Sequence, residues 1–237
     1  MRFYIPSYKR ADSCITVDYL RGCGVQSSDI YISTQTAEDY AQYLANYGCK
    51  CNVIYRKGDN VAMNRNTCIQ HARKEGVVRF CMLDDDIDCI MSFLPKRDTR
   101  IEGARFADFM CGIEKTLEQG ASIVGLYPIS NNMFALSQKR ATRAMLTGRF
   151  LAFGTTDYLF DEEYRIKEDY ELCLRMMSRN KCVLRLNWYY AKASLHQKGG
   201  CFSDFQSGAS EEFSKRLLMI YPDLIKKSRR AGEIVMK

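Results

Sequence analysis

Three consecutive carboxylates follow a short apolar run, and of all the residues in the chain they are the best placed to do chemistry. Asp84, Asp85 and Asp86 come directly after Phe80-Cys81-Met82-Leu83. In open α/β sheets, ligands bind at the carboxyl ends of the strands. Because adjacent carboxylates repel one another, they favour a divalent cation, and Mg²⁺ or Mn²⁺ takes one or two carboxylates together with water and phosphate oxygens. The pattern predicts a metal-assisted site for a diphosphate, although an acidic turn that caps a helix has the same sequence.

A second acidic element, Lys167-Glu168-Asp169-Tyr170-Glu171, lies at the expected start of a helix. Acidic residues suit the first turn of any helix because they complement the helix dipole. At the carboxyl edge of a sheet, Asp169 or Glu168 could instead act as a general base. The spacing does not decide between these two interpretations.

The chain has two histidines. His71 falls inside a helical pattern, and we interpret it as structural or solvent-exposed. His196 precedes Gln197-Lys198-Gly199-Gly200, where it could ligate a metal while Lys198 approaches a phosphate. An ordinary surface turn is the alternative, since short motifs match by chance.

Short apolar runs alternate with longer helical patterns along most of the chain. The runs that predict strands cover residues 3–5, 29–33, 51–55, 77–83, 121–126 and 183–190. The helical patterns cover residues 13–21, 36–47, 61–75 and 103–119, with another helix starting near residue 167. Strands separated by helices of this length indicate parallel pairing. We therefore predict an α/β fold with a mostly parallel, Rossmann-like sheet flanked by helices.

The last residues of the chain have a different character. Residues 215–237 hold seven basic and two acidic side chains, a local balance of +5. We interpret residues 206–237 as a basic helical tail that packs on the main domain of residues 1–205. A solvated amphipathic helix is favoured over an arm that binds phosphate.

The composition narrows the class of protein. The chain has 237 residues, 46% of them apolar and 27% charged, with a net charge of +7. These values exclude fibrous and disordered proteins, and the length suits one domain or one domain with a small annex. Eleven cysteines occur without any Cys-x-x-Cys, so we expect reduced thiols in a cytoplasmic protein rather than a zinc site or a disulfide framework. The longest apolar runs are too short to span a membrane, and the N-terminus is not a signal peptide.

Taken in order, five segments resemble the GT-A glycosyltransferases. They are the opening 4–12, the helix segment Ala62-Met63-Asn64-Arg65-Asn66, the motif Leu83-Asp84-Asp85-Asp86, the pair Glu168-Asp169 followed by Leu172 and Arg175, and His196 with Gly199-Gly200. The resemblance covers residues 1–205. Within that fold, the opening Ile-Pro-Ser-x-x-Arg-Ala-Asp and the segment His-x-Lys-Gly-Gly resemble the TET-associated and phage-type glycosyltransferases. These enzymes are thought to modify hydroxymethylated pyrimidines in DNA.

The resemblance implies transfer of a sugar from a nucleotide-diphosphate sugar, such as a UDP-sugar, with Mn²⁺ or Mg²⁺ as cofactor. It places the donor on side chains from several segments, namely Pro6, Ser7, Arg10, Arg65, Asp84, Asp85 and Lys198. It assigns the metal to Asp86 and Asp84, with His196 as a further ligand. In an inverting enzyme Asp169, beside Glu168, would deprotonate the acceptor hydroxyl. The implied acceptor is a hydroxymethylated base in DNA.

Two alternatives belong to other functional classes. A nucleotidyltransferase uses a related scaffold with carboxylates and magnesium, but it usually places a glycine-rich loop after the first strand. Here that loop is Pro6-Ser7-Tyr8-Lys9-Arg10, which lacks glycine. A non-catalytic nucleic-acid-binding protein would suit the charge of +7. Dense carboxylates at a strand end would repel phosphate unless a metal is present. The sequence does not indicate an oligomeric state.

Overall fold

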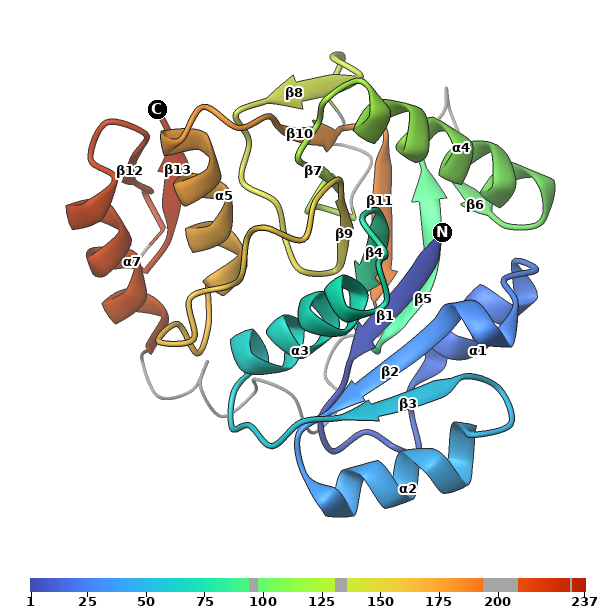
Figure 1. Ribbon diagram of the computed structural model, residues 1–237. Coiled ribbons are helices and arrows are strands. Elements are labelled where there is room, and N and C mark those ends of the chain that lie inside the picture. Colours follow the sequence, from blue (N-terminus) through green and yellow to red (C-terminus); the bar gives the residue numbers. More distant parts are fainter. Residues whose placement is uncertain (94–97, 131–135, 194–208, 231) are drawn as a thin grey trace.

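The computed structural model describes residues 1–237 except 94–97, 131–135, 194–208 and 231. Its centre is an eight-stranded sheet in the order β3-β2-β1-β4-β9-β7-β10-β8 (Figure 1). These strands are β1 Arg2–Pro6, β2 Ile30–Thr34, β3 Asn52–Tyr55, β4 Phe80–Leu83, β7 Ile123–Leu126, β8 Arg140–Thr142, β9 Phe150–Phe153 and β10 Val183–Leu186. The antiparallel pairings are those made by β8 and β9, and the others are parallel. The predicted α/β fold with a mostly parallel sheet is confirmed.

Helices cover both faces of this sheet. They are α1 Ile15–Gly22, α2 Ala37–Tyr47, α3 Val61–Lys74, α4 Ala104–Glu118, α5 Glu168–Ser178 and α7 Ala209–Ile220. Phe3 and Ile5 of β1 pack in a core with α1, α2 and α4. Tyr4 points the other way, into a core with α3, α5 and α7. Alternate residues of a strand face opposite sides, so one central strand supplies both cores.

Two smaller sheets complete the described structure. One is three-stranded, in the order β11-β5-β6, with β5 Ile87–Ser92, β6 Thr99–Ile101 and β11 Tyr189–Ala193. The other is a hairpin of β12 Ile225–Lys227 and β13 Ile234–Met236. A 3-10 helix, η1, spans Ser27–Asp29 and leads into β2.

The starts of α2 and α3 are fixed by their own side chains. Thr36 accepts a hydrogen bond from the backbone N–H of Asp39 at 3.0 Å. Asn60 accepts one from the backbone N–H of Met63 at 2.9 Å. Such caps satisfy amides that have no partner within the helix. Because both helices follow parallel strands, their N-terminal ends lie at the carboxyl edge of the sheet.

The prediction of one strand over residues 183–190 is wrong. The chain forms β10, then turns at Asn187-Trp188 and continues as β11 in the other sheet. Asn187 is buried, and its backbone and side-chain amides donate to the carbonyls of Lys139 and Gln138. A buried polar side chain with such partners stabilises a turn inside a run that otherwise has strand composition.

The description of residues 206–237 as a helical tail is also wrong in part. The helix α7 ends at Ile220, just before Tyr221-Pro222, and a β-hairpin follows. Proline lacks the backbone N–H and disfavours helical geometry in the residue before it. The expected packing is present, because Leu217 and Ile225 are buried in the core that contains α5.

The described cysteines are all free, and most of them are buried. This agrees with the expectation that they pack as small apolar side chains. No helix in the described ranges is long and apolar enough to cross a membrane.

Candidate active site

A cavity of about 600 Å³ opens at the carboxyl edge of the main sheet. It contains every predicted site residue that the structure describes, namely Pro6, Ser7, Arg10, Arg65, Asp84, Asp85, Asp86, Glu168 and Asp169. These residues come from the loop after β1, from α3, from the end of β4 and from the start of α5. His196 and Lys198 were also predicted to belong to the site, but they lie outside the described residues.

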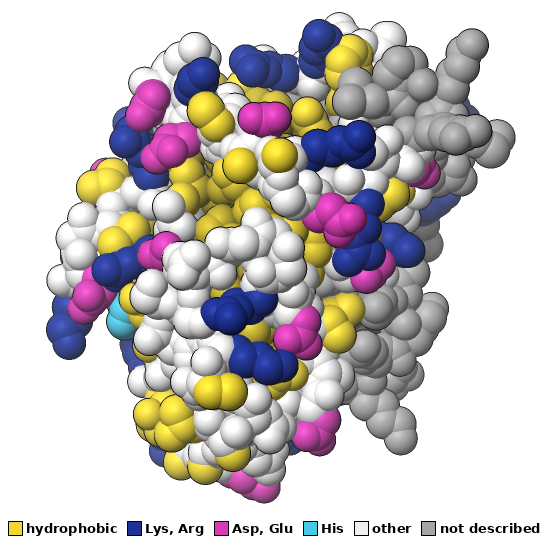
Figure 2. Space-filling model, turned by 90° about the vertical axis from the view of Figure 1, so that its right-hand side faces the viewer, with side chains coloured by type: hydrophobic (Ala, Val, Ile, Leu, Met, Phe, Trp, Pro, Cys, Tyr) yellow, Lys and Arg dark blue, Asp and Glu magenta, His cyan; other side chains and the backbone are white. Residues whose placement is uncertain are grey.

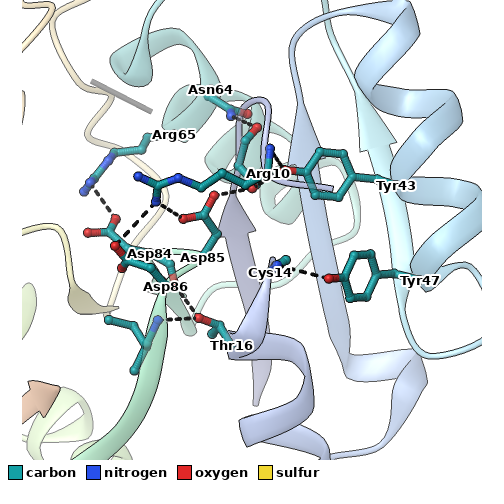
Figure 3. Close-up of polar contacts among 12 residues, drawn as sticks. Arg10, Cys14, Thr16, Tyr43, Tyr47, Asn64, Arg65, Asp84, Asp85 and Asp86 are labelled. Atoms are coloured by element: carbon teal, nitrogen blue, oxygen red, sulfur yellow. Dashed lines mark hydrogen bonds and ion pairs between the residues drawn. The ribbon is translucent and has the colours of Figure 1, made fainter. Parts of the chain in front are cut away.

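The loop after β1 is held by helices rather than by glycine. Tyr43 of α2 accepts a hydrogen bond from the backbone N–H of Arg10 at 2.9 Å, and Asn64 of α3 donates to the carbonyl of Ser7 at 3.0 Å (Figure 3). Tyr47 of α2 accepts from the backbone N–H of Cys14 at 3.0 Å. The loop therefore reaches the cavity with a defined backbone.

Asp85 organises this loop from inside. Its carboxylate is buried and pairs with Arg10 Nη1 at 2.6 Å, and its second oxygen accepts a hydrogen bond from Ser7 Oγ. Arg10 also reaches Asp86 at 3.4 Å. The family resemblance predicts that Asp85 contacts the donor, and this stays a prediction. In the structure its two oxygens bond to Arg10 and Ser7, so Asp85 positions these two residues.

The turn that carries the three carboxylates is fixed by α1. Thr16 Oγ1 donates to the carbonyl of Asp84 at 2.6 Å and accepts from the backbone N–H of Ile87 at 2.9 Å. One hydroxyl thus joins the residues at both ends of the acidic turn. Figure 3 shows Thr16 below the carboxylates.

Arg65 joins the two acidic elements that are far apart in the sequence. Its guanidinium lies 3.0 Å from Asp84 and 3.3 Å from Glu168, and its side chain is only 5% exposed. It also lies over the ring of Phe160, 5.5 Å from the ring centre. A Cβ atom on Gly148 would come within 1.9 Å of this guanidinium. Glycine is therefore required at position 148 for Arg65 to occupy this place.

Asp169 is oriented by backbone amides. Its Oδ2 accepts a hydrogen bond from the N–H of Gly148, and its Oδ1 accepts one from the N–H of Tyr170, both at 2.8 Å. Asp169 is only partly buried, whereas Glu168 is buried against Arg65. Of the two carboxylates, Asp169 is the more accessible from the cavity.

Several of these carboxylates ionise less readily than usual. Burial raises the pKa of Asp86 to about 6, and the charges of Asp84 and Asp85 add to the rise. Burial also raises the pKa of Glu168 to about 8, against the opposing effect of Arg65. The pKa of Asp169 is raised for the same reason. Arg65 lowers the pKa of both Glu168 and Asp169, but burial and the charge of the neighbouring carboxylates outweigh its effect.

The acidic turn is suited to a divalent cation. The side chains of Asp84 and Asp86 keep 30% and 19% of their surface exposed, whereas Asp85 keeps 6%. Within the described residues, no three His, Cys, Asp or Glu side chains form a ready ligand set. Mg²⁺ usually takes one or two carboxylates and completes its shell with water and substrate phosphates. Asp84 and Asp86 therefore fit a metal that a bound diphosphate would complete.

Sequence reasoning missed several residues of the cavity. Gly148 and Arg149 line it because they precede β9, which runs antiparallel to β4 and β7. The start of an antiparallel strand lies where its parallel neighbours end. The signal was present as Thr147-Gly148-Arg149 before the apolar run 150–153, but that run was not identified as a strand. Thr16 carried no signal beyond its helical pattern, and Asn64 was named only within the segment 62–66, without a role of its own.

Comparisons with known proteins agree with this fold. A model of the TET-associated glycosyltransferase family matches residues 1–200. A search of curated proteins found no match. Among solved structures, a cytidylyltransferase from Leptospira borgpetersenii is 8% identical, with 96% of this chain and 98% of that chain covered and a TM-score of 0.52.

Two further structures match less closely. A mannose-1-phosphate geranyltransferase from Thermus thermophilus is 10% identical over 81% of this chain and 75% of that one, with a TM-score of 0.49. A putative nucleotide-diphospho-sugar transferase from Desulfovibrio desulfuricans is 14% identical over 78% and 80%, with a TM-score of 0.45. At such low identities a structural likeness indicates only a shared fold.

Proposed function

Because the chain belongs to the TET-associated glycosyltransferase family, we propose that it moves a sugar from a nucleotide-diphosphate sugar to an acceptor hydroxyl by a GT-A type, metal-dependent reaction. The observation that carries this proposal is the arrangement of the cavity. Strand-terminal carboxylates lie on one side, the pair Glu168-Asp169 lies on the other, and Arg65 pairs with both. A donor diphosphate and an acceptor hydroxyl need such groups at a short distance from each other.

The donor belongs on the side of β1, α3 and β4. Asp86 and Asp84 would hold Mn²⁺ or Mg²⁺, and the cation would offset the charge of the diphosphate as it leaves. Pro6 and Arg10 line the same side. Asn64 Oδ1 is buried and has no hydrogen-bond partner among the described residues. A hydroxyl or N–H group of the nucleotide would satisfy it, and a UDP-sugar offers both.

The acceptor belongs on the side of α5. Asp169 would take the proton of the attacking hydroxyl in an inverting reaction. The amides of Gly148 and Tyr170 hold its two oxygens, so the carboxylate would meet the hydroxyl in a fixed orientation. Glu168 is buried against Arg65 and is less suited to this step.

We further propose a hydroxymethylated pyrimidine in DNA as the acceptor. The resemblance to DNA-modifying glycosyltransferases supports this choice, and the charge of +7 would attract a phosphate backbone. On the face drawn in Figure 2, however, Lys and Arg side chains lie among Asp and Glu. That face does not add to the argument. The target base would have to reach Asp169 from single-stranded DNA, from the major groove or by base flipping.

Neither alternative receives specific support. The likeness to a cytidylyltransferase indicates a scaffold that nucleotidyltransferases share, and the loop after β1 is held by tyrosines and Asn64 instead of glycines. A non-catalytic nucleic-acid-binding protein would gain nothing from buried carboxylates around a cavity.

The test is a transfer assay. The protein is incubated with Mn²⁺, a panel of nucleotide sugars, and DNA that contains hydroxymethylcytosine or hydroxymethyluracil. The DNA is then digested to nucleosides, and their molecular masses are measured. We expect a mass gain of one sugar with one donor, and loss of that gain in excess chelator and in Asp86→Asn. Asp88→Asn, a partly exposed aspartate on β5, is the matched control.

The outcomes separate the parts of the proposal. Thermal shift with each donor reports binding independently, since a ligand at a hundred times its Kd stabilises by about 2.7 kcal/mol. If a donor binds and is hydrolysed, but neither the hydroxymethylcytosine DNA nor the hydroxymethyluracil DNA gains a sugar, the DNA acceptor is rejected. Sugar transfer to another acceptor would then still stand. Full turnover in excess chelator would reject the metal. If no nucleotide sugar binds, the proposal that the protein is a glycosyltransferase is rejected.

A further inference from the structure

A segment beyond the family match packs against the start of α5. This C-terminal unit, defined as α7 and the hairpin β12–β13 (residues 209–237 except 231), lies beside α5 in Figure 1. The family model matches residues 1–200 and does not include it. Its contacts concentrate on the residues just before and just after Glu168 and Asp169.

The contact before the pair is made by Lys167. Its ammonium donates to Ser214 Oγ of α7 and to the carbonyl of Gly232 at 2.6 Å, and it lies 4.0 Å from Glu233. The side chain is 8% exposed. A buried ammonium needs such partners, because an unpaired charge is costly away from water. All three partners belong to the C-terminal unit.

The backbone of Lys167 indicates the same constraint. Its φ is +61°, in the left-handed region, although it is not glycine. A non-glycine residue in this sparsely populated region is destabilising, and it persists where surrounding contacts determine it. Here the ammonium contacts of Lys167 are those surrounding contacts. The C-terminal unit thus helps to set the direction in which the chain enters α5.

The contact after the pair is made by Glu171. Tyr221, which follows α7, donates its hydroxyl to Glu171 Oε1 at 3.1 Å. Glu171 is buried and also pairs with Arg175 at 2.8 Å. Lys167 and Glu171 therefore bracket Glu168 and Asp169, and both are bonded to the C-terminal unit.

The loop that leads into α5 is held by the same unit. Arg216 of α7 pairs with Glu163 and lies over the ring of Tyr164, 4.7 Å from its centre. The ring of Phe213 packs on Tyr164 at 5.2 Å. Glu233 of the hairpin reaches the lining of the cavity itself.

We propose that the C-terminal unit positions the carboxylate pair for sugar transfer, with Lys167 and Tyr221 as positioning residues. This inference rests on the proposed function for its kinetic consequence, and on the structure alone for its effect on α5. A displacement of about 1 Å at a reacting group can lower a rate on the order of a hundredfold. Contacts that fix the first turn of α5 on both sides prevent such a displacement.

The experiment compares two independent variants in the full-length protein. Lys167→Asn removes the ammonium but keeps a residue that tolerates left-handed backbone. Tyr221→Phe removes only the hydroxyl. Lys215→Asn, an exposed position on α7, and Tyr55→Phe, an exposed position on β3, are the matched controls. Hydrogen exchange of the amides of residues 168–172 is measured together with kcat and KM for transfer, and Lys167→Arg tests rescue.

We expect faster exchange at residues 168–172 in both variants but in neither control. We also expect kcat to fall by about tenfold to a hundredfold while the KM for the donor stays within about twofold, with partial recovery in Lys167→Arg. Unchanged exchange and kcat in both variants would overturn the proposal. A loss that falls on donor KM alone would overturn it too, because Lys167 would then contact the donor.

Absence of transfer by the wild-type protein would reject the proposed function. In that case the hydrogen exchange still decides whether the C-terminal unit positions α5.

Discussion

Arg65 is the residue on which the arrangement of the cavity depends. Its guanidinium pairs with Asp84 at the end of β4 and with Glu168 at the start of α5, and it is almost fully buried. Buried ion pairs are weak sources of net stability, but breaking one leaves an uncompensated charge. A change that displaces Arg65 therefore disturbs both acidic elements together.

Gly148→Ala is predicted to displace Arg65 without altering any charge. The added methyl group would lie about 1.9 Å from the guanidinium, so Arg65 must move away from Asp84 and Glu168. We expect overpacking to lower the free energy of unfolding by about 1–3 kcal/mol, and turnover to fall far more than thermal stability suggests. Gly112→Ala on α4, where a Cβ meets no described atom within 4 Å, is the control. Equal activity in the two variants would contradict the prediction.

Asp169→Asn is predicted to lower turnover and leave donor binding intact. The amide keeps the shape of the side chain but removes the basic oxygen, and loss of a general base costs about a hundredfold to ten-thousandfold in rate. Turnover and calorimetric donor binding are the measurements. Asp157→Asn, an exposed aspartate in the loop before α5, is the control. Near-normal turnover would show that Asp169 is only a helix-start residue.

Glu168 is predicted to make stability depend on pH. Burial raises its pKa from 4.5 to about 8 in the folded protein. Folding therefore favours the protonated carboxyl, and its contribution is full below pH 4.5 and is lost as the pH rises toward 8. Glu168→Gln carries no titratable group. The free energy of unfolding of wild type minus that of Glu168→Gln should therefore be larger at about pH 5 than at about pH 8.

Denaturant titrations across that range test this dependence on pH. Glu118→Gln, at an exposed position on α4, serves as the control and should show no such change in the difference. Parallel pH profiles for wild type and Glu168→Gln would contradict the prediction.

At the scale of elements, one antiparallel strand and one short helix assemble the cavity. β9 runs against β4 and β7, so the residues just before it, Gly148 and Arg149, reach the edge where the parallel strands end. The first turn of α1 supplies Thr16, which holds the acidic turn. The segment before β9 acts through the backbone N–H of Gly148, and α1 acts through one hydroxyl, so the local pattern of polar and apolar residues does not reveal either role.

Thr16→Val is predicted to loosen the acidic turn. Valine has the shape of threonine but leaves the buried amide of Ile87 without its partner, at a cost of about 1–3 kcal/mol. We expect a lower melting temperature and weaker metal-dependent donor binding. Thr142→Val on the exposed face of β8 is the control. A Thr16→Val protein with wild-type stability and wild-type donor binding would contradict this role of α1.

At the scale of the whole molecule, two cores lie back to back across the sheet. The core with α1, α2 and α4 supports the proposed donor loop, and the core with α3, α5 and α7 supports the proposed base. β1 and β4 contribute to both cores, since their residues alternate between the two faces. The two sides of the cavity are therefore joined by the central strands of the sheet.

Binding of DNA is predicted to weaken steeply as the salt concentration rises. In a plot of log K against log salt concentration, each phosphate that the protein contacts adds about −0.9 to the slope. Arg229 and Arg230 are exposed on the hairpin that carries Glu233 to the cavity. Arg229→Gln with Arg230→Gln should therefore reduce the magnitude of the slope by about 2. Lys74→Gln with Lys181→Gln removes the same charge at exposed positions on the opposite edge of the sheet and should leave the slope unchanged. Equal slopes for both pairs would remove the hairpin from the DNA interface.

The sequence by itself determined the order of the main elements and the position of the acidic turn. Hydrophobic runs and helical periodicity are local, so β1, β2, β3, β4 and β7 and the helices between them could be predicted within a few residues. Because β4 is parallel to its neighbour β1, its last residue had to lie at the carboxyl edge, and Asp84-Asp85-Asp86 with it.

Only the tertiary structure decided which groups meet there. The pairing of Arg65 with Glu168 joins residues far apart in the chain, and the amide of Gly148 reaches Asp169 because β9 enters the sheet in the opposite direction. The hairpin after Pro222 and the bond from Lys167 to Gly232 likewise depend on which surfaces pack together. Such contacts arise from long-range packing, which the local pattern of polar and apolar residues does not encode.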